Sequence, residues 1–258
     1  MNPVCVSVII PAYNCAKYIE KAIDSVLVQN VPLEIIVIND CSTDNIEEVM
    51  GKYFRLENVI YIKNLRNLGA AESRNKGVNI ARGEYIAFLD GDDIWREGKL
   101  QKQLELIEES NAVLCTTARQ IINRKGEVTK KIIPTKTVIS YKQLMKNNCI
   151  SCSSVLLKKT VAQKFPMHHD DCHEDYIMWL EILREYKFAC GVNEPLLLYR
   201  QSNTGKSGNK LKSAIMTFKV YRYLGFGLFK SVLCFCSYVF NGVRKHKTDL
   251  KSPNPRYL

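Results

Sequence analysis

The sequence predicts an α/β protein with a doubly wound, mostly parallel sheet and a C-terminal helical extension. Three observations support this class. Short apolar runs alternate four times with segments of helical periodicity between residues 4 and 116, which is typical of strand–helix units in a parallel sheet. An apolar segment flanked by basic residues follows at 224–247. The chain has 258 residues and is 46% hydrophobic, enough for one large domain with a real core.

The elements of the first 117 residues follow from apolar periodicity. The strands are short runs rich in Val and Ile, and the helices carry apolar residues three and four positions apart, as Ile19, Ile23 and Val26 do. Ser42, Thr43 or Asp44 is expected to cap the second helix. We expect strands at 4–10, 34–38, 59–62, 85–89 and 113–116, alternating with helices at 17–29, 44–54, 70–81 and 99–109.

The second half is less regular. The turn Arg124-Lys125-Gly126 predicts a hairpin between 120–123 and 127–133. Further strands are expected at 153–157 and 196–199. Between them, the polar run 168–175 opens an amphipathic helix, whose apolar stripe includes Ile177, Leu180 and Leu183.

Polar side chains follow three of the predicted strands: Tyr13-Asn14, Asn39-Asp40, and the acids at 90–93. In a doubly wound sheet, ligands bind beyond the carboxyl ends of the strands, so these clusters should share one crevice. No G-x-G-x-x-G follows the first strand and no G-x-x-x-x-G-K-[ST] is present, which weakens dinucleotide and P-loop interpretations.

Three acids, Asp90, Asp92 and Asp93, lie within four residues at the end of the apolar run 85–89. Carboxylates this close repel each other, and they are costly at the end of a buried strand unless a cation lies among them. A hard divalent cation that also binds phosphates needs only one or two carboxylates. The cluster indicates a Mg²⁺ or Mn²⁺ site for a phosphorylated ligand; the alternative is a solvated acidic turn, because Asp and Gly are common in turns.

The net charge of +11 lies entirely in the C-terminal part of the chain. Residues 1–183 carry 23 basic and 23 acidic side chains, and residues 184–258 carry 14 basic and 3 acidic ones. A cationic tail suggests an anionic surface, either nucleic acid or phospholipid.

A membrane surface suits this tail better than nucleic acid, because the tail is amphipathic. Seven apolar side chains share one face of a predicted helix: Phe229, Val232, Leu233, Cys236, Val239, Phe240 and Val243. Such a face beside basic residues is typical of a helix lying in a membrane interface. A helix docked on the domain core is the first alternative. A membrane span is the second, because Lys230 shortens the apolar run below the ~20 residues that a span needs.

Five segments follow one another over roughly residues 4–182: Val6-Ser7-Val8-Ile9-Ile10-Pro11-Ala12-Tyr13-Asn14, Ile36-Val37-Ile38-Asn39-Asp40-Cys41-Ser42-Thr43-Asp44, residues 67–77 with Ser73-Arg74-Asn75-Lys76-Gly77, Phe88-Leu89-Asp90-Gly91-Asp92-Asp93 and His173-Glu174-Asp175-Tyr176-Ile177-Met178-Trp179-Leu180. In this order they resemble the family 2 glycosyltransferases, inverting enzymes of the GT-A fold, which is a Rossmann-like nucleotide-sugar fold. The family usually has two acids where this chain has Asn39-Asp40, and a glycine at Cys41.

The resemblance implies a nucleoside-diphosphate sugar donor, most often UDP-linked. Tyr13 would pack on the uracil and Asp40 would accept its N–H. The metal at Asp90, Asp92 and Asp93 would bridge the diphosphate. Arg74 would add positive charge near it, with an arginine on the surface of its helix as the alternative. The implied nucleotide-binding residues are Pro11, Tyr13, Asn14, Asp40, Arg74 and Asp90.

Inverting transfer also needs a base for the acceptor hydroxyl, and Asp175 is the candidate. It lies in the first turn of a predicted helix, where the macrodipole favours the carboxylate and keeps it ionised at neutral pH. Glu174 is the second candidate, with simple helix N-terminal charge as the alternative for both. His173 and Trp179 are expected on the acceptor side. A zinc site of His168, His169, Cys172 and His173 is a rival interpretation of the polar run.

These expectations combine into one functional hypothesis. Residues 1–222 form the catalytic domain, with a nucleotide-binding half at 1–117 and an acceptor-binding half at 118–222, and residues 223–258 form the basic tail. The enzyme is expected in the cytoplasm, peripheral on the membrane, adding single sugars to a lipid-linked glycan, since the Q-x-x-R-W of processive synthases is absent. A sugar-phosphate nucleotidyltransferase and a non-catalytic nucleotide-binding protein are the alternatives.

Overall fold

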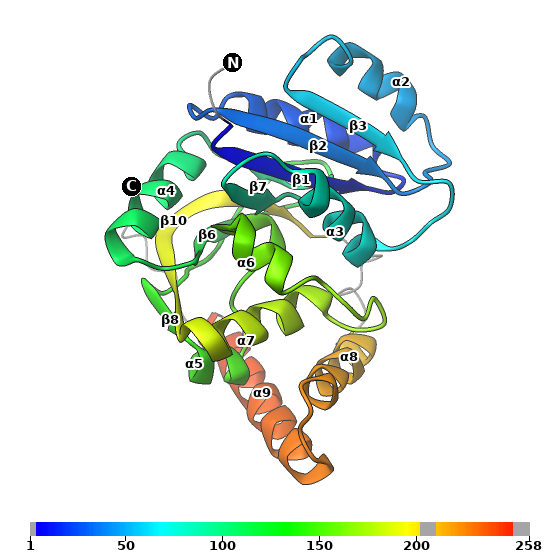
Figure 1. Cartoon of the computed structure of the whole chain (residues 1–258). Coiled ribbons are helices and arrows are strands. Elements are labelled where there is room, and N and C mark those ends of the chain that lie inside the picture. The colour runs from blue at the N-terminus through cyan, green and yellow to red at the C-terminus, as the bar shows by residue number, and fades with distance from the viewer. Residues whose placement is uncertain (1–3, 202–209, 250–258) are drawn as a thin grey trace.

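The computed structural model describes residues 4–201 and 210–249. They form one ten-stranded sheet in the order β3-β2-β1-β4-β9-β6-β10-β5, with β7 paired to β6 and β8 to β10. Helices cover both faces of this sheet (Figure 1). The predicted α/β class is therefore confirmed.

The strand–helix alternation of the first half is present, with ends shifted by a few residues. Strands β1 to β4 pair only in parallel with one another, as the repeated strand–helix units require. The elements are β1 (Val6–Ala12), α1 (Ala16–Leu27), β2 (Leu33–Asn39), α2 (Ile46–Met50), the 3₁₀ helix η1 (Gly51–Tyr53), β3 (Val59–Lys63), α3 (Ala70–Ile80) and β4 (Tyr85–Phe88).

Successive side chains along each strand point to opposite faces of the sheet and belong to two separate hydrophobic cores. Ile9 and Ile36 pack with α3 and the helices on its side, whereas Val8 and Ile10 pack with α1 on the opposite face. On the first face α3 lies very close to β1, because a Cβ on Gly77 would stand 2.5 Å from Ile9 Cγ2. Burial on both faces explains why these strands are continuous apolar runs.

The cap expected for the second helix belongs to the first one. Asp44 Oδ2 accepts the backbone N–H of Ala16 at 2.8 Å, at the start of α1. Helix α2 starts after Asn45 and has no side-chain cap. Asp44 therefore joins the loop after β2 to the loop after β1, a tertiary contact that sequence periodicity does not reveal.

The sheet becomes mixed beyond β4. Strand β9 is antiparallel to both β4 and β6, while β10 is parallel to β6. The remaining elements are β5 (Ile94–Trp95), α4 (Lys99–Ser110), β6 (Leu114–Ile122), β7 (Val128–Ile133), β8 (Val138–Ser140), α5 (Tyr141–Lys146), the 3₁₀ helix η2 (Cys152–Ser154), β9 (Leu156–Lys158), α6 (Lys159–Lys164), α7 (Glu174–Tyr186), β10 (Phe188–Arg200), α8 (Lys210–Tyr223) and α9 (Leu228–Asp249).

Three sequence expectations need correction here. The strand expected at 153–157 is η2 followed by β9, and the short strand at 196–199 is the end of the 13-residue β10. Register shifts around Pro195, which cannot donate to the ladder, hid the length of β10. The strand expected at 113–116 extends to Ile122 as β6, so the suggested boundary between the halves at residue 117 lies inside one strand.

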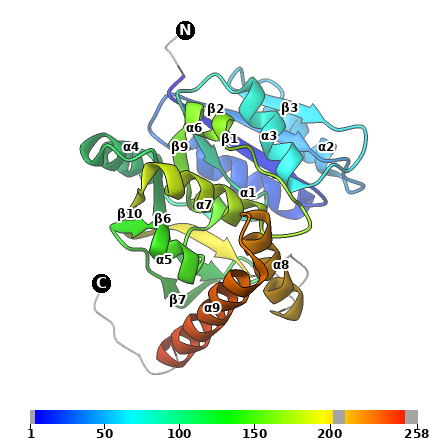
Figure 2. The same cartoon turned by 60° about the horizontal axis from the view of Figure 1, so that its bottom comes forward.

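Helices α8 and α9 lie together beyond α7 at one end of the molecule (Figure 2). Phe218 and Phe235 meet edge to face at 5.9 Å, and Tyr238 lies 6.2 Å from Tyr176 of α7. One side of α9 is therefore docked on the domain. The opposite side leaves apolar side chains exposed, among them Phe229 at 78% and Phe240 at 68%. Within the described residues, no helix is both long enough and apolar enough to span a membrane.

Candidate active site

A cleft of about 1310 Å³ opens beyond the carboxyl ends of β1, β2 and β4. Its far wall comes from β6, β7, β10, α7 and α9. All the residues predicted for nucleotide, metal and base line it: Pro11, Tyr13, Asn14, Asp40, Arg74, Asp90, Asp92, Asp93, Glu174 and Asp175, with His173 beside them. The three polar clusters of the sequence therefore share one crevice, as parallel strands predict.

Asn14 joins the first two strand-end loops. Its backbone N–H donates to Ser42 Oγ at 3.0 Å, and its Oδ1 accepts from the backbone of Thr43 at 2.8 Å. It holds a positive φ of 49°, a conformation that asparagine tolerates better than most residues. These bonds leave the neighbouring Tyr13 ring half-exposed at the cleft rim.

Asp40 organises the loop before α3. Its Oδ1 accepts from the backbone N–H of Leu68 and from Asn64 Nδ2, and its Oδ2 accepts from the N–H of Gly69, each at 2.8 Å. A carboxylate has about four acceptor positions, so one position on Oδ2 stays available.

The two residues beside Asp40 depart from the usual family pattern, and hydrogen bonds explain the first of them, Asn39. Asn39 donates to the Tyr61 hydroxyl at 2.7 Å and accepts from the Ser42 N–H at 2.9 Å. These bonds need both a donor and an acceptor, which an amide supplies and an ionised carboxylate does not. Cys41 has a φ of +60°, in the left-handed region that glycine adopts without steric strain, which explains why the family usually has a glycine there.

Arg74 joins the two halves of the site. Its Nη2 lies 2.6 Å from Asp90 Oδ1, and its Nη1 lies 2.9 Å from Glu174 Oε1. The Arg74 and Glu174 side chains are only 6% and 7% exposed, so both charges are buried. The surface-helix alternative for Arg74 is therefore wrong: its side chain crosses from α3 to the end of β4 and the start of α7.

The three acids after β4 have different surroundings. Asp93 is buried, and its Oδ1 accepts the backbone N–H of Arg200 at 2.8 Å, so this carboxyl fixes the end of β10. Burial, together with the charges of Asp90 and Asp92, raises the pKa of Asp93 well above its usual range. Burial, and then the charge of Asp90, raises the pKa of Asp92 to about 6.

The catalytic candidates lie at the start of α7. Burial, followed by the neighbouring charge of Glu174, raises the pKa of Asp175 to about 6. Burial thus outweighs the helix N-terminus, which the sequence led us to expect as the dominant influence. The carboxylate is still mostly ionised at neutral pH.

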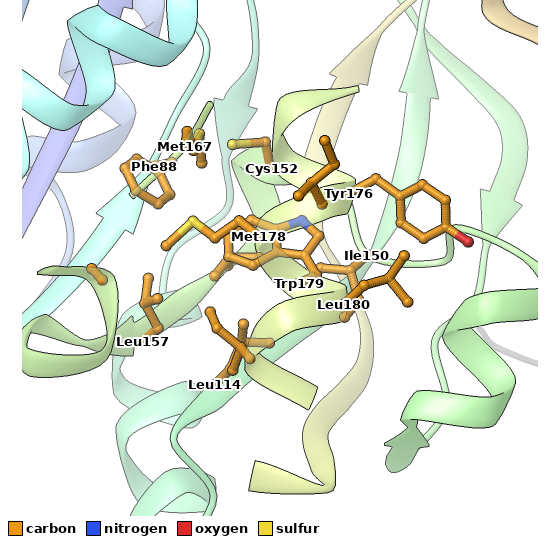
Figure 3. Close-up of a cluster of buried hydrophobic side chains, with 14 of the residues drawn as sticks. Phe88, Leu114, Ile150, Cys152, Leu157, Met167, Tyr176, Met178, Trp179 and Leu180 are labelled. Carbon is orange, nitrogen blue, oxygen red and sulfur yellow. The ribbon is translucent and has the colours of Figure 1, made fainter. Parts of the chain in front are cut away.

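Trp179 is the one predicted site residue that does not reach the cleft. It is fully buried, and its ring lies 6.4 Å from that of Phe88 in the core (Figure 3). The expected acceptor-side role is wrong because Trp179 lies one helical turn after Asp175, where the same face of α7 packs on the sheet. His173 does line the cleft, and its Nε2 lies 3.1 Å from Ser213 Oγ of α8.

The polar run before α7 supports the loop instead of forming a zinc site. The His169 ring stacks on Tyr223 at 3.7 Å, and Cys172 Sγ donates to the His169 carbonyl. Over residues 4–201 and 210–249, no three His, Cys, Asp or Glu side chains gather as a metal would need.

Arg200 is a site residue that sequence reasoning missed. Its Nε donates to the Asp92 carbonyl at 2.8 Å, its Nη1 donates to the Asn123 carbonyl at 2.9 Å, and its guanidinium lies 4.4 Å from the Tyr18 ring centroid. It joins the acidic turn to the β6–β7 hairpin. The only signal in the sequence was an arginine at the end of a predicted strand.

We predict that Arg74→Met destabilises the fold by about 3 kcal/mol or more, because breaking a buried ion pair leaves uncompensated carboxylates. Lys52→Gln, which breaks the exposed ion pair with Glu20, is the matched control and should change stability little. Urea unfolding of both variants measures the effect. Equal midpoints for Arg74→Met and the wild-type protein would contradict it.

Comparison with known proteins shows the family of the chain. Residues 7–164 match the profile of the family described as Glycosyl transferase family 2. Over 243 residues the chain is 36% identical to TuaG of Bacillus subtilis (strain 168), provisionally named a teichuronic acid biosynthesis glycosyltransferase, covering 93% of this chain and 96% of TuaG. It is 34% identical to the Escherichia coli UDP-Glc:alpha-D-GlcNAc-diphosphoundecaprenol beta-1,3-glucosyltransferase WfaP, covering 93% and 95%.

Solved structures show the same fold. The S. aureus TarS 1-349 complex with UDP-GlcNAc superposes with a TM-score of 0.71 at 16% identity, covering 92% of this chain and 72% of that one. The Pyrobaculum calidifontis mannosyltransferase PcManGT, in complex with GDP-Man and Mn²⁺, gives 0.68 at 17% identity, covering 90% and 69%. The sequence match, the GT-A architecture and the position of the cleft lead to one conclusion: this chain belongs to the family 2 glycosyltransferases.

Proposed function

We propose that the protein is an inverting, non-processive glycosyltransferase that moves one sugar from a UDP-sugar to a hydroxyl of a lipid-linked glycan. One observation carries the proposal: Asp90, Asp92 and Asp175 line a single cleft, in which the buried Arg74 pairs with Asp90 and with Glu174. The names of relatives support the substrate class, since WfaP is named for UDP-glucose and a diphosphoundecaprenol acceptor. Family membership argues against a nucleotidyltransferase and a non-catalytic protein.

The donor would bind at the ends of β1, β2 and β4. The exposed Tyr13 ring offers a face on which uracil can pack. The free acceptor position on Asp40 suits the N–H of the base, while Pro11 and Asn14 shape the rim. Arg74 adds positive charge beside Asp90, where the diphosphate would lie.

The acids after β4 fit a shared divalent cation. Asp90 and Asp92 both line the cleft, and their repulsion and burial raise the pKa of Asp92, a cost that a cation would remove. The absence of a three-ligand set among the described residues suits Mg²⁺ or Mn²⁺, which take one or two carboxylates and complete their shell with water and phosphate. When bound, the metal would stabilise charge on the leaving diphosphate. Asp93 is engaged with Arg200 and would support the turn.

Asp175 would be the base. The acceptor oxygen forms a bond to the anomeric carbon, the bond from that carbon to the diphosphate oxygen breaks, and the hydroxyl proton moves to Asp175. Glu174 suits this role less well, because its carboxylate is buried against Arg74. We assign Glu174 to holding the start of α7 and to raising the pKa of Asp175.

The exposed side of α8 and α9 would hold the enzyme on the cytoplasmic face of an anionic membrane. Leu228, Phe229 and Leu233 are more than half exposed on α9, and Leu211 and Ile215 are more than half exposed on α8. This arrangement combines the docked and interfacial alternatives, because one side of α9 packs and the other remains apolar and exposed. Val243 lies outside the residues whose side chains the structure describes.

We predict that Asp175→Asn lowers transfer by about 10²–10⁴-fold and leaves UDP affinity unchanged, because shape is kept and the proton acceptor is lost. In the wild-type enzyme, the rate at saturating substrates should fall as pH drops through about 6, because Asp175 is then protonated and can no longer accept the hydroxyl proton. The control is Asp171→Asn, an exposed acid outside the cleft. Near-normal turnover of Asp175→Asn would move the base elsewhere.

We predict that Asp92→Asn removes the Mn²⁺ dependence of UDP binding. Calorimetric titration of UDP with Mn²⁺, and with a chelator in its place, should show a large difference for the wild-type protein and little for the variant. Glu97→Gln, an exposed acid close to the same turn, should behave as wild type. If the chelator has no effect on wild-type binding, the metal proposal fails.

We predict that Leu228→Ser/Phe229→Ser/Phe240→Ser abolishes flotation with anionic vesicles, whereas Val28→Ser, an exposed apolar residue at the end of α1, does not. High salt should release the wild-type protein only in part, because salt screens charge but not apolar insertion. Wild-type protein that stays out of every vesicle mixture would contradict membrane binding.

A further inference from the structure

One wall of the cleft has no role in the proposed chemistry. It is a face of the sheet formed by Arg119 and Ile121 of β6, Ile133 of β7 and Tyr199 of β10. The register pairs Arg119 with Ile133 and Ile121 with Tyr199, so these four side chains share one face. The wall is apolar except for the guanidinium and the Tyr199 hydroxyl.

Arg119 differs from the other buried arginines of the cleft. Arg74 is matched by two carboxylates, and Arg200 by backbone carbonyls. Within residues 4–201 and 210–249, the Arg119 guanidinium has neither ion pair nor hydrogen bond; its contact is the Tyr199 ring, 5.7 Å from its Cζ. It is not among the buried nitrogen atoms that lack a partner, so its N–H groups open to the cleft.

A partly buried guanidinium that has no ion pair or hydrogen bond among the described residues points to an anionic ligand. Burial lowers the pKa of Arg119, although an arginine keeps its proton in proteins. Removing a charge from water without a partner is costly, and a phosphate that accepts the two parallel N–H bonds of a guanidinium offsets that cost.

The position of Arg119 favours the acceptor over the donor. In the sheet order, β6 lies two strands beyond β4, on the side away from β1 and β2, which hold the predicted base pocket. The charges of Tyr199, Asp93 and Asp175, in that order of size, oppose the lowering of the Arg119 pKa, so the guanidinium is within electrostatic reach of the acidic turn and of the proposed base. Ile150 of the loop before η2 and Tyr238, on the docked side of α9, extend the apolar lining to that helix.

We propose that Arg119 binds the diphosphate of the acceptor and thereby selects acceptors that carry an anionic diphosphate beside the sugar. This inference rests on the proposed function. An apolar wall with one cation suits a sugar diphosphate attached to an apolar chain, whose sugar hydroxyl would then face Asp175. Arg119 is a specificity-determining residue on this view and takes no part in proton transfer.

The test compares two acceptors that share one sugar: an N-acetylhexosamine linked through diphosphate to a short alkyl chain, and the neutral alkyl glycoside. Arg119→Gln should raise KM for the diphosphate acceptor about 10–100-fold, the size expected for a lost hydrogen bond to a charged group. KM for the neutral acceptor and the affinity for UDP should not change. Arg119→Lys should show a smaller loss, since a lysine keeps charge but not the two parallel bonds.

Lys130→Gln is the matched control, because it removes one positive charge from β7 at an exposed position outside the cleft lining. It should leave both KM values unchanged. Equal loss for both acceptors would make Arg119 merely structural, and weaker UDP binding would make it a donor residue. An unchanged KM for the diphosphate acceptor would also overturn the inference.

A binding measurement tests this inference separately from the proposed function on which it rests. The alkyl diphosphate acceptor is titrated calorimetrically into wild type, Arg119→Gln, Arg119→Lys and Lys130→Gln, each loaded with UDP and Mn²⁺, so no turnover is needed. Binding that falls only in the Arg119 variants supports the inference even if no transfer is detected. Absence of transfer with every donor would refute the proposed function, and equal binding in all variants would refute the role of Arg119.

Discussion

The buried double ion pair of Arg74 is the interaction on which the rest of the site depends. One guanidinium from α3 holds Asp90, at the end of β4, and Glu174, in the first turn of α7. These residues are 16 and 100 positions away from Arg74 in the chain. Because Arg74 and Glu174 are buried and Asp90 is partly buried, the positions of the acidic turn and of the proposed base are coupled. A shift of either element would leave a buried charge without its partner.

Two other acids of the cleft, Asp92 and Asp175, lie in surroundings that disfavour their charged form. Burial raises the pKa values of both Asp92 and Asp175 to about 6, with a further contribution from the neighbouring charge, Asp90 for Asp92 and Glu174 for Asp175. Perturbed carboxyl groups that converge in one cleft are typical of active sites. By contrast, Asp40 and Asp93 accept backbone N–H groups and shape the loops. These four acids of the cleft thus divide into two that shape the loops, Asp40 and Asp93, and two that are proposed for chemistry, Asp92 and Asp175.

Docking of α9 places the apolar end of the molecule next to the proposed acceptor side of the cleft. Tyr238 reaches both the cleft lining and Tyr176 of α7, while Phe229 and Phe240 face outward. The same helix therefore helps to close the site and presents apolar surface beside it. That arrangement is economical for an enzyme whose acceptor would be anchored in a membrane.

Sequence periodicity determined the parallel half of the sheet, because strands buried on both faces leave continuous apolar runs such as β1 and β2. It also located the cleft, since Asp40 and Asp90 directly follow such runs. It did not reveal the length of β10, in which Pro195 interrupts the pattern, nor the burial of Trp179, whose direction depends on which side of α7 packs on the sheet. The partners of Arg74 and Arg200, and the position of Arg119 in the cleft wall, were decided only in the tertiary structure. An arginine can lie on the surface or in a buried ion pair. Which of the two it does depends on residues distant in the chain that only the fold brings close to it.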